Sequence, residues 1–355
     1  MANYFNQRDA KNNEKLGQII ENDLPPFCEE FFVGISSNTT ALTRLNYAYD
    51  LRTFFNFVTT RITRFKTKRP CDITLIDLEN MSPFEIEKYM NYLDNYADEE
   101  GNLIQNRELG KRRKLSALRA LVKFFQRKQL LHMDPTVSVI NPKIRPKEII
   151  RLEGNEITQM LDVVESGEGL SEHQQKYQEN TRIRDMAIVS LLLGTGIRVS
   201  ELVGIDVNDV DFSNLSFVVT RKGGARTILY FSDEVAGMLY DYYVLRVKNT
   251  KCDEKETALF LSLQNKRITT RAVENVVKKY AAIATPLKHI TPHKLRSTFG
   301  TALYKKTGNI YMVADVLGHK DVNTTQKHYA AIQEDSRKIA STKVELRSDD
   351  NDDDN

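Results

Sequence analysis

Four short stretches in the second half of the chain carry arginine, histidine and tyrosine side chains, which can bind anions, transfer protons or form covalent bonds. They are Gly194–Leu202 (GTGIRVSEL), Thr291–Arg296 (TPHKLR), Leu317–Asp321 (LGHKD) and Asn323–Tyr329 (NTTQKHY). A planar guanidinium grips two oxygens at once and stays protonated, and an imidazole can hydrogen-bond or move a proton near neutral pH. Such residues suit a reaction in which negative charge develops on oxygen.

Two arginines differ from ordinary surface arginines by their place in the sequence. Arg198 follows Gly194-Thr195-Gly196, where we expect a helix to end and the chain to turn. Arg296 comes three residues after His293, which would put both on one face of a helix. A zinc site is disfavoured, because no Glu or Cys completes a ligand set at metal spacing.

In this order the four stretches resemble the tyrosine recombinase (phage integrase) family, specifically its Xer-like branch. The pattern covers about residues 182–331, and Tyr47–Phe54 (YAYDLRTF) is similar to the first helix of that family's core-binding domain. The resemblance implies a site-specific DNA recombinase that cuts and rejoins strands through a covalent 3′-phosphotyrosine. It also implies a mainly α fold with a small β-sheet, made of a helical N-terminal core-binding domain and an α+β catalytic domain.

The resemblance also assigns roles to individual residues. Arg198 and Arg296 would stabilise the charge that spreads over the non-bridging phosphate oxygens. His293 and His319 would hydrogen-bond the scissile phosphate or move a proton, and Glu201 would support the first arginine. Because the covalent intermediate stores the energy of the broken bond, no metal, ATP or other cofactor is expected.

A lysine at a predicted hairpin turn, Lys222, would be the general acid that protonates the departing 5′-oxygen. The family's usual Gly-Lys-Gly is Arg221-Lys222-Gly223 in this chain. Arg221 therefore places a second cation beside the predicted acid. Taken by itself, a lysine at a hairpin turn is more often simply solvated.

Tyr329 would be the nucleophile. In many relatives the tyrosine comes one position earlier, and this chain has His328 at that place. Tyr311 is a poorer candidate, since it lies upstream in a predicted helix. A phenol with a pKa near ~10 is a weak nucleophile at neutral pH, so neighbouring cations and a histidine would have to ease its deprotonation.

The catalytic part is predicted to mix helices with a small sheet. Strands over residues 215–220 and 226–231 flank Lys222-Gly223-Gly224, a β-hairpin signal because Gly-Gly supplies positive φ. The polar segment 168–181 is expected to be a surface loop. Helices are expected over residues 182–193, 235–248, 270–283, 292–307 and 310–317.

The N-terminal part is predicted to be helical, with helices over residues 39–58, 82–96 and 108–131. Asn38 or Thr39 could cap the first, and Ser82-Pro83 opens the second. The third would bury Leu115, Leu118, Leu121, Val122 and Phe125. Its other face presents Arg112, Arg119 and Lys123, with Lys111, Arg113 and Lys114 beside them. This face is either a solvated basic surface or a DNA-binding helix that replaces phosphate counterions.

A linker is expected at Asn141–Glu148 (NPKIRPKE), because its two prolines disfavour regular structure. The predicted domains are a DNA-binding core-binding domain at 1–145, a catalytic domain at 146–348 and a disordered acidic tail at 349–355. Residues 332–347 could form a terminal helix with an apolar patch. In the resembled family such a segment docks into a neighbouring protomer; the alternative is packing on its own domain.

Composition narrows the class of protein. The chain has 355 residues, 41% of them hydrophobic, without any apolar run near the ~18 residues of a membrane span. The polar N-terminus does not resemble a signal peptide, and Cys28, Cys71 and Cys252 form no CxxC pair. Net charge is +3, and without the five aspartates of the tail it is +8, with 51 basic and 43 acidic residues. A cytoplasmic, nucleoid-associated protein that binds a polyanion is expected.

The expected partner is double-stranded DNA with inverted half-sites, bound by a homotetramer that acts on two duplexes. Xer-like resolution of chromosome or plasmid dimers is favoured, since about 37 residues precede the first family-like helix, which is short for an additional arm-binding domain. The integrase of a mobile element is the alternative. From a different class, a non-catalytic sequence-specific DNA-binding protein is disfavoured, because every expected polar residue has a candidate. The sequence specifies no accessory protein.

Overall fold

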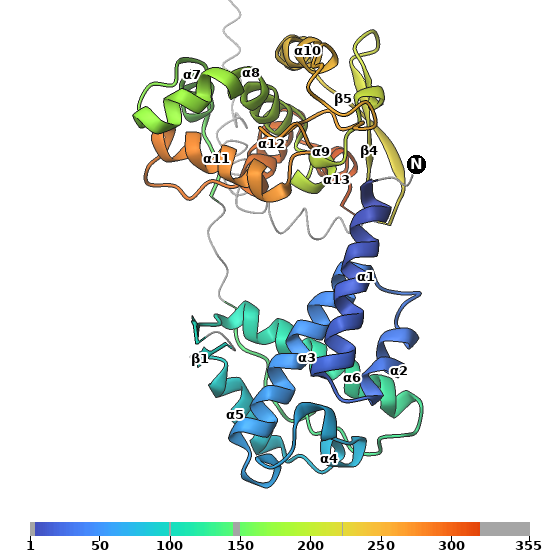
Figure 1. The fold of residues 1–355 in the computed structure, drawn as a ribbon. Helices are drawn as coiled ribbons and strands as arrows, with labels where there is room; N and C mark the ends of the chain where they lie inside the picture. The colour runs from blue at the N-terminus through green and yellow to red at the C-terminus, as the bar shows by residue number, and fades with distance from the viewer. Residues whose placement is uncertain (1–3, 99–100, 145–149, 222, 320–355) are drawn as a thin grey trace, which may run out of the picture. The chain divides into compact units, whose positions relative to one another are not determined.

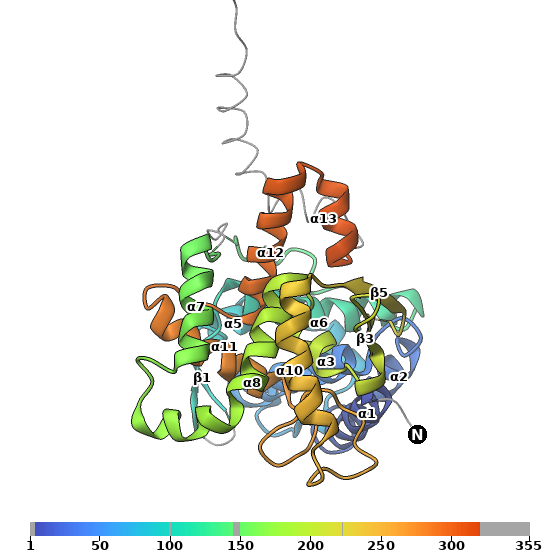
Figure 2. The ribbon, with the colours of Figure 1, turned by 90° about the horizontal axis from the view of Figure 1, so that it is seen from above.

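The computed structural model describes residues 4–98, 101–144, 150–221 and 223–319. The chain divides into two compact units, Met1–Lys147 and Glu148–Asn355. Both are mainly helical and both contain a small sheet, so the predicted fold class is confirmed (Figures 1 and 2). The expected domain boundary near residue 145 falls within 145–149, outside these ranges.

The N-terminal unit is built around helix α3, against which α1 and α6 both pack (Figure 1). Its elements are α1 (Tyr4–Asp23), α2 (Phe27–Gly34), α3 (Ala41–Arg61), α4 (Leu75–Glu79), α5 (Pro83–Tyr92), β1 (Tyr96–Ala97), β2 (Leu103–Ile104) and α6 (Glu108–Arg127). Strands β1 and β2 pair antiparallel.

Side-chain caps mark where α3 and α5 begin. Thr40 accepts a hydrogen bond from the first turn of α3, so the cap is Thr40 rather than Asn38 or Thr39. Helix α5 begins at Pro83, as predicted, and Ser82 and Glu85 form a reciprocal capping box around this start.

Helix α6 buries one face in an aromatic core. The five residues predicted to point inward are all 0% exposed: Leu115, Leu118, Leu121, Val122 and Phe125. They belong to the same buried cluster as Phe54 and Phe55 of α3. The apolar periodicity of the sequence therefore identified the packing face of this helix correctly.

A buried carboxylate also joins α3 to α6. Asp50 is 1% exposed, and its oxygens lie 3.1 Å from Lys114 Nζ and 2.7 Å from Arg113 Nη1. Burial raises the pKa of Asp50, while the two cations act to lower it. Lys114 is itself buried, so its predicted place on an exposed basic face is wrong.

The C-terminal unit is organised around helix α8, which contacts α7, α10 and α12. Its elements are α7 (Gly154–Ser166), α8 (Glu172–Thr195), α9 (Val199–Val203), β3 (Val210–Asp211), β4 (Ser216–Thr220), β5 (Arg226–Tyr230), α10 (Asp233–Val247), α11 (Thr270–Ala284), α12 (Pro292–Thr307) and α13 (Ile310–Leu317). The sheet is antiparallel in the order β3-β4-β5.

The loop predicted over residues 168–181 is wrong in large part, because α8 begins at Glu172. Ser171 caps the helix and forms a capping box with Gln174. Most side chains between residues 172 and 180 are exposed, so the segment lacks the apolar periodicity that marks a helix. Gln178 is the buried exception, and it donates a hydrogen bond to Val164 O at 2.9 Å.

A polar centre holds α8 against α11. Asp185 is 0% exposed and accepts hydrogen bonds from Lys279 Nζ at 3.0 Å and from Tyr280 Oη at 2.9 Å. Its other oxygen accepts from Arg184 Nη2 at 2.7 Å. These hydrogen bonds offset the cost of burying the Asp185 carboxylate. They also hold α8 in place, and the C-terminal end of α8 carries the Gly-Thr-Gly turn.

A β-hairpin and a pair of packed helices complete the C-terminal unit. The predicted β-hairpin forms, with Gly223 at φ 99° and Gly224 at φ 86° in its turn. Helices α12 and α13 lie side by side (Figure 2), and Val313 and Leu317 pack against Tyr304. Helix α13 is therefore held along α12 up to its last residue, Leu317.

Candidate active site

Gly196 turns the chain where α8 ends. It adopts φ 61° and its backbone N–H donates to Leu192 O, so it closes the helix in the left-handed conformation that glycine adopts without strain. A Cβ at this position would lie 2.4 Å from Phe299 Cδ1 of α12. Glycine thus permits both the turn and the close approach of α12.

Arg198 follows this turn and precedes α9. Its backbone N–H donates to Glu201 Oε2 at 2.9 Å, and its Nη1 donates to Glu201 Oε1 at 2.7 Å. Glu201 is 3% exposed, so its carboxylate is a fixed anchor. Arg198 Nη2 reaches Gly318 O at 3.1 Å. Glu201 therefore holds Arg198 through two hydrogen bonds, which is the contact that the family resemblance implies.

Arg296 lies on α12 and is 5% exposed. Its Nη1 donates to Gly196 O at 2.7 Å and its Nη2 donates to Leu317 O. The guanidinium therefore connects the Gly-Thr-Gly turn to the end of α13. Burying this cation among backbone carbonyls holds it in one orientation.

A third arginine, which the sequence-based prediction did not include among the site residues, also reaches the end of α13. Arg221 Nη2 donates to Val316 O at 3.0 Å. Arg221, Arg296 and Arg198 therefore donate to three successive carbonyls, those of residues 316, 317 and 318. The last carbonyls of a helix lack partners within the helix and carry its partial negative charge, so they attract cations. The departure from Gly-Lys-Gly was the signal that could have revealed Arg221.

The two predicted histidines lie on the elements that carry this cluster. His293 is an exposed residue in the first turn of α12, one turn before Arg296. His319 follows Gly318 and its backbone N–H donates to Ala314 O at 2.9 Å. Three of the four sequence stretches are thus brought together at the end of α13. Phosphate binding is the chemistry that suits such a gathering of guanidinium groups.

Two predicted site residues lie outside the described ranges, namely Lys222 and Tyr329. Within those ranges, the competing tyrosine, Tyr311, is 72% exposed at the start of α13. The cation cluster is at the opposite end of that helix.

The predicted DNA-binding residues lie on α6 of the other unit. Arg112 and Lys123 are exposed. Arg119 instead donates to Asn141 Oδ1 at 2.6 Å and to the carbonyls of Thr136 at 3.2 Å and Val139 at 2.6 Å. These hydrogen bonds hold the segment after α6 against the helix. Arg119 therefore has a structural role that the sequence did not predict.

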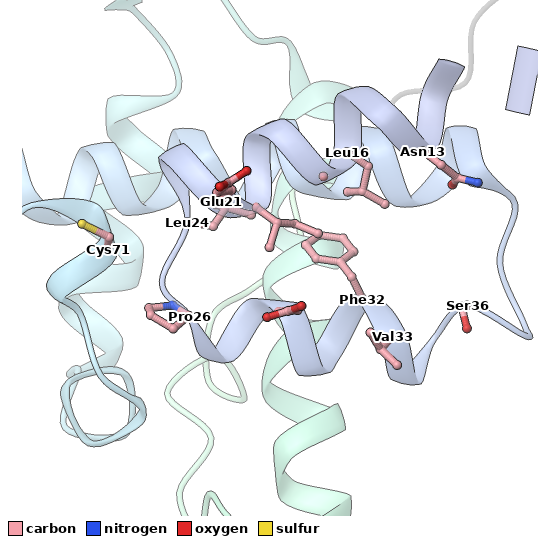
Figure 3. A pocket seen from close by; sticks show the side chains of 12 residues that line it. Asn13, Leu16, Glu21, Leu24, Pro26, Phe32, Val33, Ser36 and Cys71 are labelled. Carbon is pink, nitrogen blue, oxygen red and sulfur yellow. The ribbon is translucent and has the colours of Figure 1, made fainter. Parts of the chain in front are cut away.

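An apolar pocket in the N-terminal unit contains none of the predicted site residues. It lies between α1 and α2, is lined by Leu16, Leu24, Phe32 and Val33 among others, and has a volume of 660 Å³ (Figure 3). In the described part of the chain, no cluster of three or more His, Cys, Asp or Glu residues could hold a metal ion. None of the described helices is long and apolar enough to cross a membrane.

Comparison with known proteins places this site in a family. Residues 150–336, more than half of the chain, match the phage integrase family. The tyrosine recombinase XerC of Caldanaerobacter subterraneus subsp. tengcongensis is 31% identical over 85% of this chain and 82% of its own length. The XerC of Leptospira interrogans serovar copenhageni is 28% identical over 87% of this chain and 89% of its own.

Solved structures share the fold at lower identity. XerH recombinase bound to a palindromic difH substrate has a TM-score of 0.62 at 16% identity, covering 86% of this chain and 80% of that one. The Tn1549 transposon integrase in complex with circular intermediate DNA has a TM-score of 0.60 at 19% identity, covering 88% and 98%. The resemblance drawn from the sequence motifs is confirmed: the chain belongs to the phage integrase family of tyrosine recombinases, enzymes that cut and rejoin DNA at specific sites.

Proposed function

We propose that Arg198 and Arg296, at the end of α13, bind the scissile phosphate and that Tyr329 is the nucleophile that attacks it. One observation supports this most: Arg198 and Arg296 come from separate sequence motifs, yet they donate to adjacent carbonyls, Gly318 O and Leu317 O. Both guanidinium groups are held before DNA arrives. Preorganised donors of this kind are the main requirement for phosphoryl transfer, where charge spreads over the non-bridging oxygens.

The reaction balances without an external energy source. Tyr329 Oη attacks phosphorus, the Oη–P bond forms and the P–O5′ bond breaks. Lys222 gives a proton to the departing 5′-oxygen, leaving a 3′-phosphotyrosine and a free 5′-hydroxyl. His293 and His319 hydrogen-bond the phosphate or take the phenol proton. A 5′-hydroxyl from a second strand then reverses the step and releases the tyrosine.

The proposed substrate is double-stranded DNA with inverted half-sites, acted on by four protomers that hold two duplexes. Similar folds have been solved bound to DNA, among them XerH with its difH substrate. Exposed Arg112 and Lys123 on α6 would contact phosphates in the N-terminal part. Since DNA is the substrate, we place the protein with the nucleoid in the cytoplasm.

The favoured biological role is Xer-like resolution of chromosome or plasmid dimers. Curated relatives that align over more than four fifths of this chain are named XerC. A second role, integration of a mobile element, is supported by the likeness to the Tn1549 transposon integrase. Binding sites can be selected from random DNA, and the most enriched sequence can then be searched for in the host chromosome and in mobile elements. Its location would distinguish the two roles.

Replacing the nucleophile should separate binding from chemistry. Tyr329→Phe should bind the target site normally and form no covalent adduct on a nicked suicide substrate, because the phenyl ring lacks the attacking oxygen. Tyr311→Phe is the matched control and should form the adduct at the wild-type rate. Denaturing gels report the adduct; an adduct in Tyr329→Phe together with none in Tyr311→Phe would reverse the assignment.

The arginines of the two units should differ in what they support. Arg198→Ala or Arg296→Ala should slow cleavage by about a hundredfold or more with little change in DNA affinity, because charge stabilisation is lost mainly in the transition state. Arg112→Ala or Lys123→Ala should weaken binding and lower the slope of log affinity against log salt by about 1. Gel-shift titrations and single-turnover cleavage measure both. Similar losses of binding and cleavage in the two groups would contradict this division.

The terminal segment is proposed to connect protomers. Residues 332–355 lie outside the described part, and the proposal rests on the apolar residues Ile332, Ile339, Ala340 and Val344. Deleting residues 332–355 should leave binding to a half-site nearly intact while abolishing cooperative binding to the full site and recombination. Deleting only residues 349–355 should change neither. Gel shifts on half and full sites test this, and undiminished cooperativity in the longer deletion would exclude the docking role.

A further inference from the structure

Arg221 closes the hairpin loop that carries Lys222. It follows directly after β4, its backbone N–H donates to Ala225 O at 2.8 Å, and its carbonyl accepts from Gly224 N at 3.0 Å. Its side chain leaves the hairpin and donates to Val316 O at 3.0 Å. One residue therefore belongs both to the loop and to the contact with α13.

The guanidinium of Arg221 fills the space in front of Gly318. A Cβ built on Gly318 would lie 1.1 Å from Arg221 Nη1 and 2.4 Å from Arg221 Cζ. Gly318 also has φ 61°, so both its conformation and this close approach require glycine. The arginine thus rests against the backbone immediately before His319.

Arg221 and His319 line the same pocket of 520 Å³ in the C-terminal unit. Arg221 Nε is buried and has no hydrogen-bond partner among the described residues, which is a cost that the contact with α13 must offset. By contrast, a Cβ built on Gly223 or Gly224 would meet nothing within 4 Å. The tip of the loop is therefore open, and Arg221 anchors its base.

We propose that Arg221 is a positioning residue that fixes the Lys222 loop against the end of α13, so that the acid and the phosphate-binding arginines keep one relative geometry. This inference rests on the proposed role of Lys222 as general acid. A general acid must lie within hydrogen-bonding distance of the atom it protonates. A loop that contains two exposed glycines at positive φ would not hold that distance by itself.

A substrate that needs no acid provides the test. Replacing the bridging 5′-oxygen by sulfur makes the leaving group a thiolate, which departs unprotonated because thiols have a pKa near ~8.5. Arg221→Ala should slow cleavage of the ordinary site by about a hundredfold and should cleave the 5′-sulfur site within about threefold of the wild-type rate. Arg221→Lys, which keeps one donor, should recover part of the loss on the ordinary site.

The control variants make the outcome decisive. Arg226→Ala removes an exposed arginine at the other end of the same loop, which pairs with Asp209 at 2.5 Å. This variant should cleave both substrates at the wild-type rate.

The outcomes for Lys222 and Arg221 separate the two proposals. If the 5′-sulfur substrate restores the cleavage rate of Lys222→Ala but not that of Arg221→Ala, the positioning role is wrong while the acid assignment stands. If Lys222→Ala is not rescued, both are wrong. Should Arg221→Ala fail to fold in thermal unfolding, Arg221→Lys carries the same comparison, and equal slowing on both substrates would overturn the proposal.

Discussion

The last carbonyl groups of helix α13 have no hydrogen-bond partner within the helix, and the architecture of the site follows from their need for donors. A helix leaves its last carbonyls without partners, and burying them unsatisfied is costly. Here the carbonyls of residues 316, 317 and 318 accept from Arg221, Arg296 and Arg198. Each arginine comes from a different element, so satisfying one helix end brings a hairpin, helix α12 and the turn before α9 to one place.

This arrangement explains the glycines of the motifs in physical terms. Gly196 lets α12 approach closely and offers its carbonyl to Arg296, while Gly318 leaves room for Arg221. Buried anchors make the positions rigid: Glu201 holds Arg198, and Asp185 holds the helix that leads to Gly196. A cationic site assembled before the substrate arrives needs little reorganisation during the reaction, which is the basis of electrostatic catalysis.

Local sequence patterns predicted the parts of this structure that local physics determines. The buried face of α6, the Gly-Gly hairpin and the start of α5 at Ser82-Pro83 all agree with the prediction. The first turns of α8 were missed because their side chains face solvent and show no periodicity. The structural roles of three basic residues were missed for another reason, namely Arg119, Lys114 and Arg221. Each donates a hydrogen bond to a residue distant in the chain, and the sequence does not show which residue that partner is.

We propose that the guanidinium groups of Arg198 and Arg296, held at the end of α13, stabilise negative charge on the scissile phosphate. Cleavage of a DNA site whose scissile phosphate is replaced by an uncharged methylphosphonate tests it most directly, since one charged oxygen becomes a methyl group. Single-turnover rates of the wild type and of Arg296→Ala on both substrates are the measurement. If Arg296 has this role, the large cleavage defect of Arg296→Ala on the phosphodiester should shrink to a few-fold defect on the methylphosphonate. An equally large defect on both substrates would contradict it.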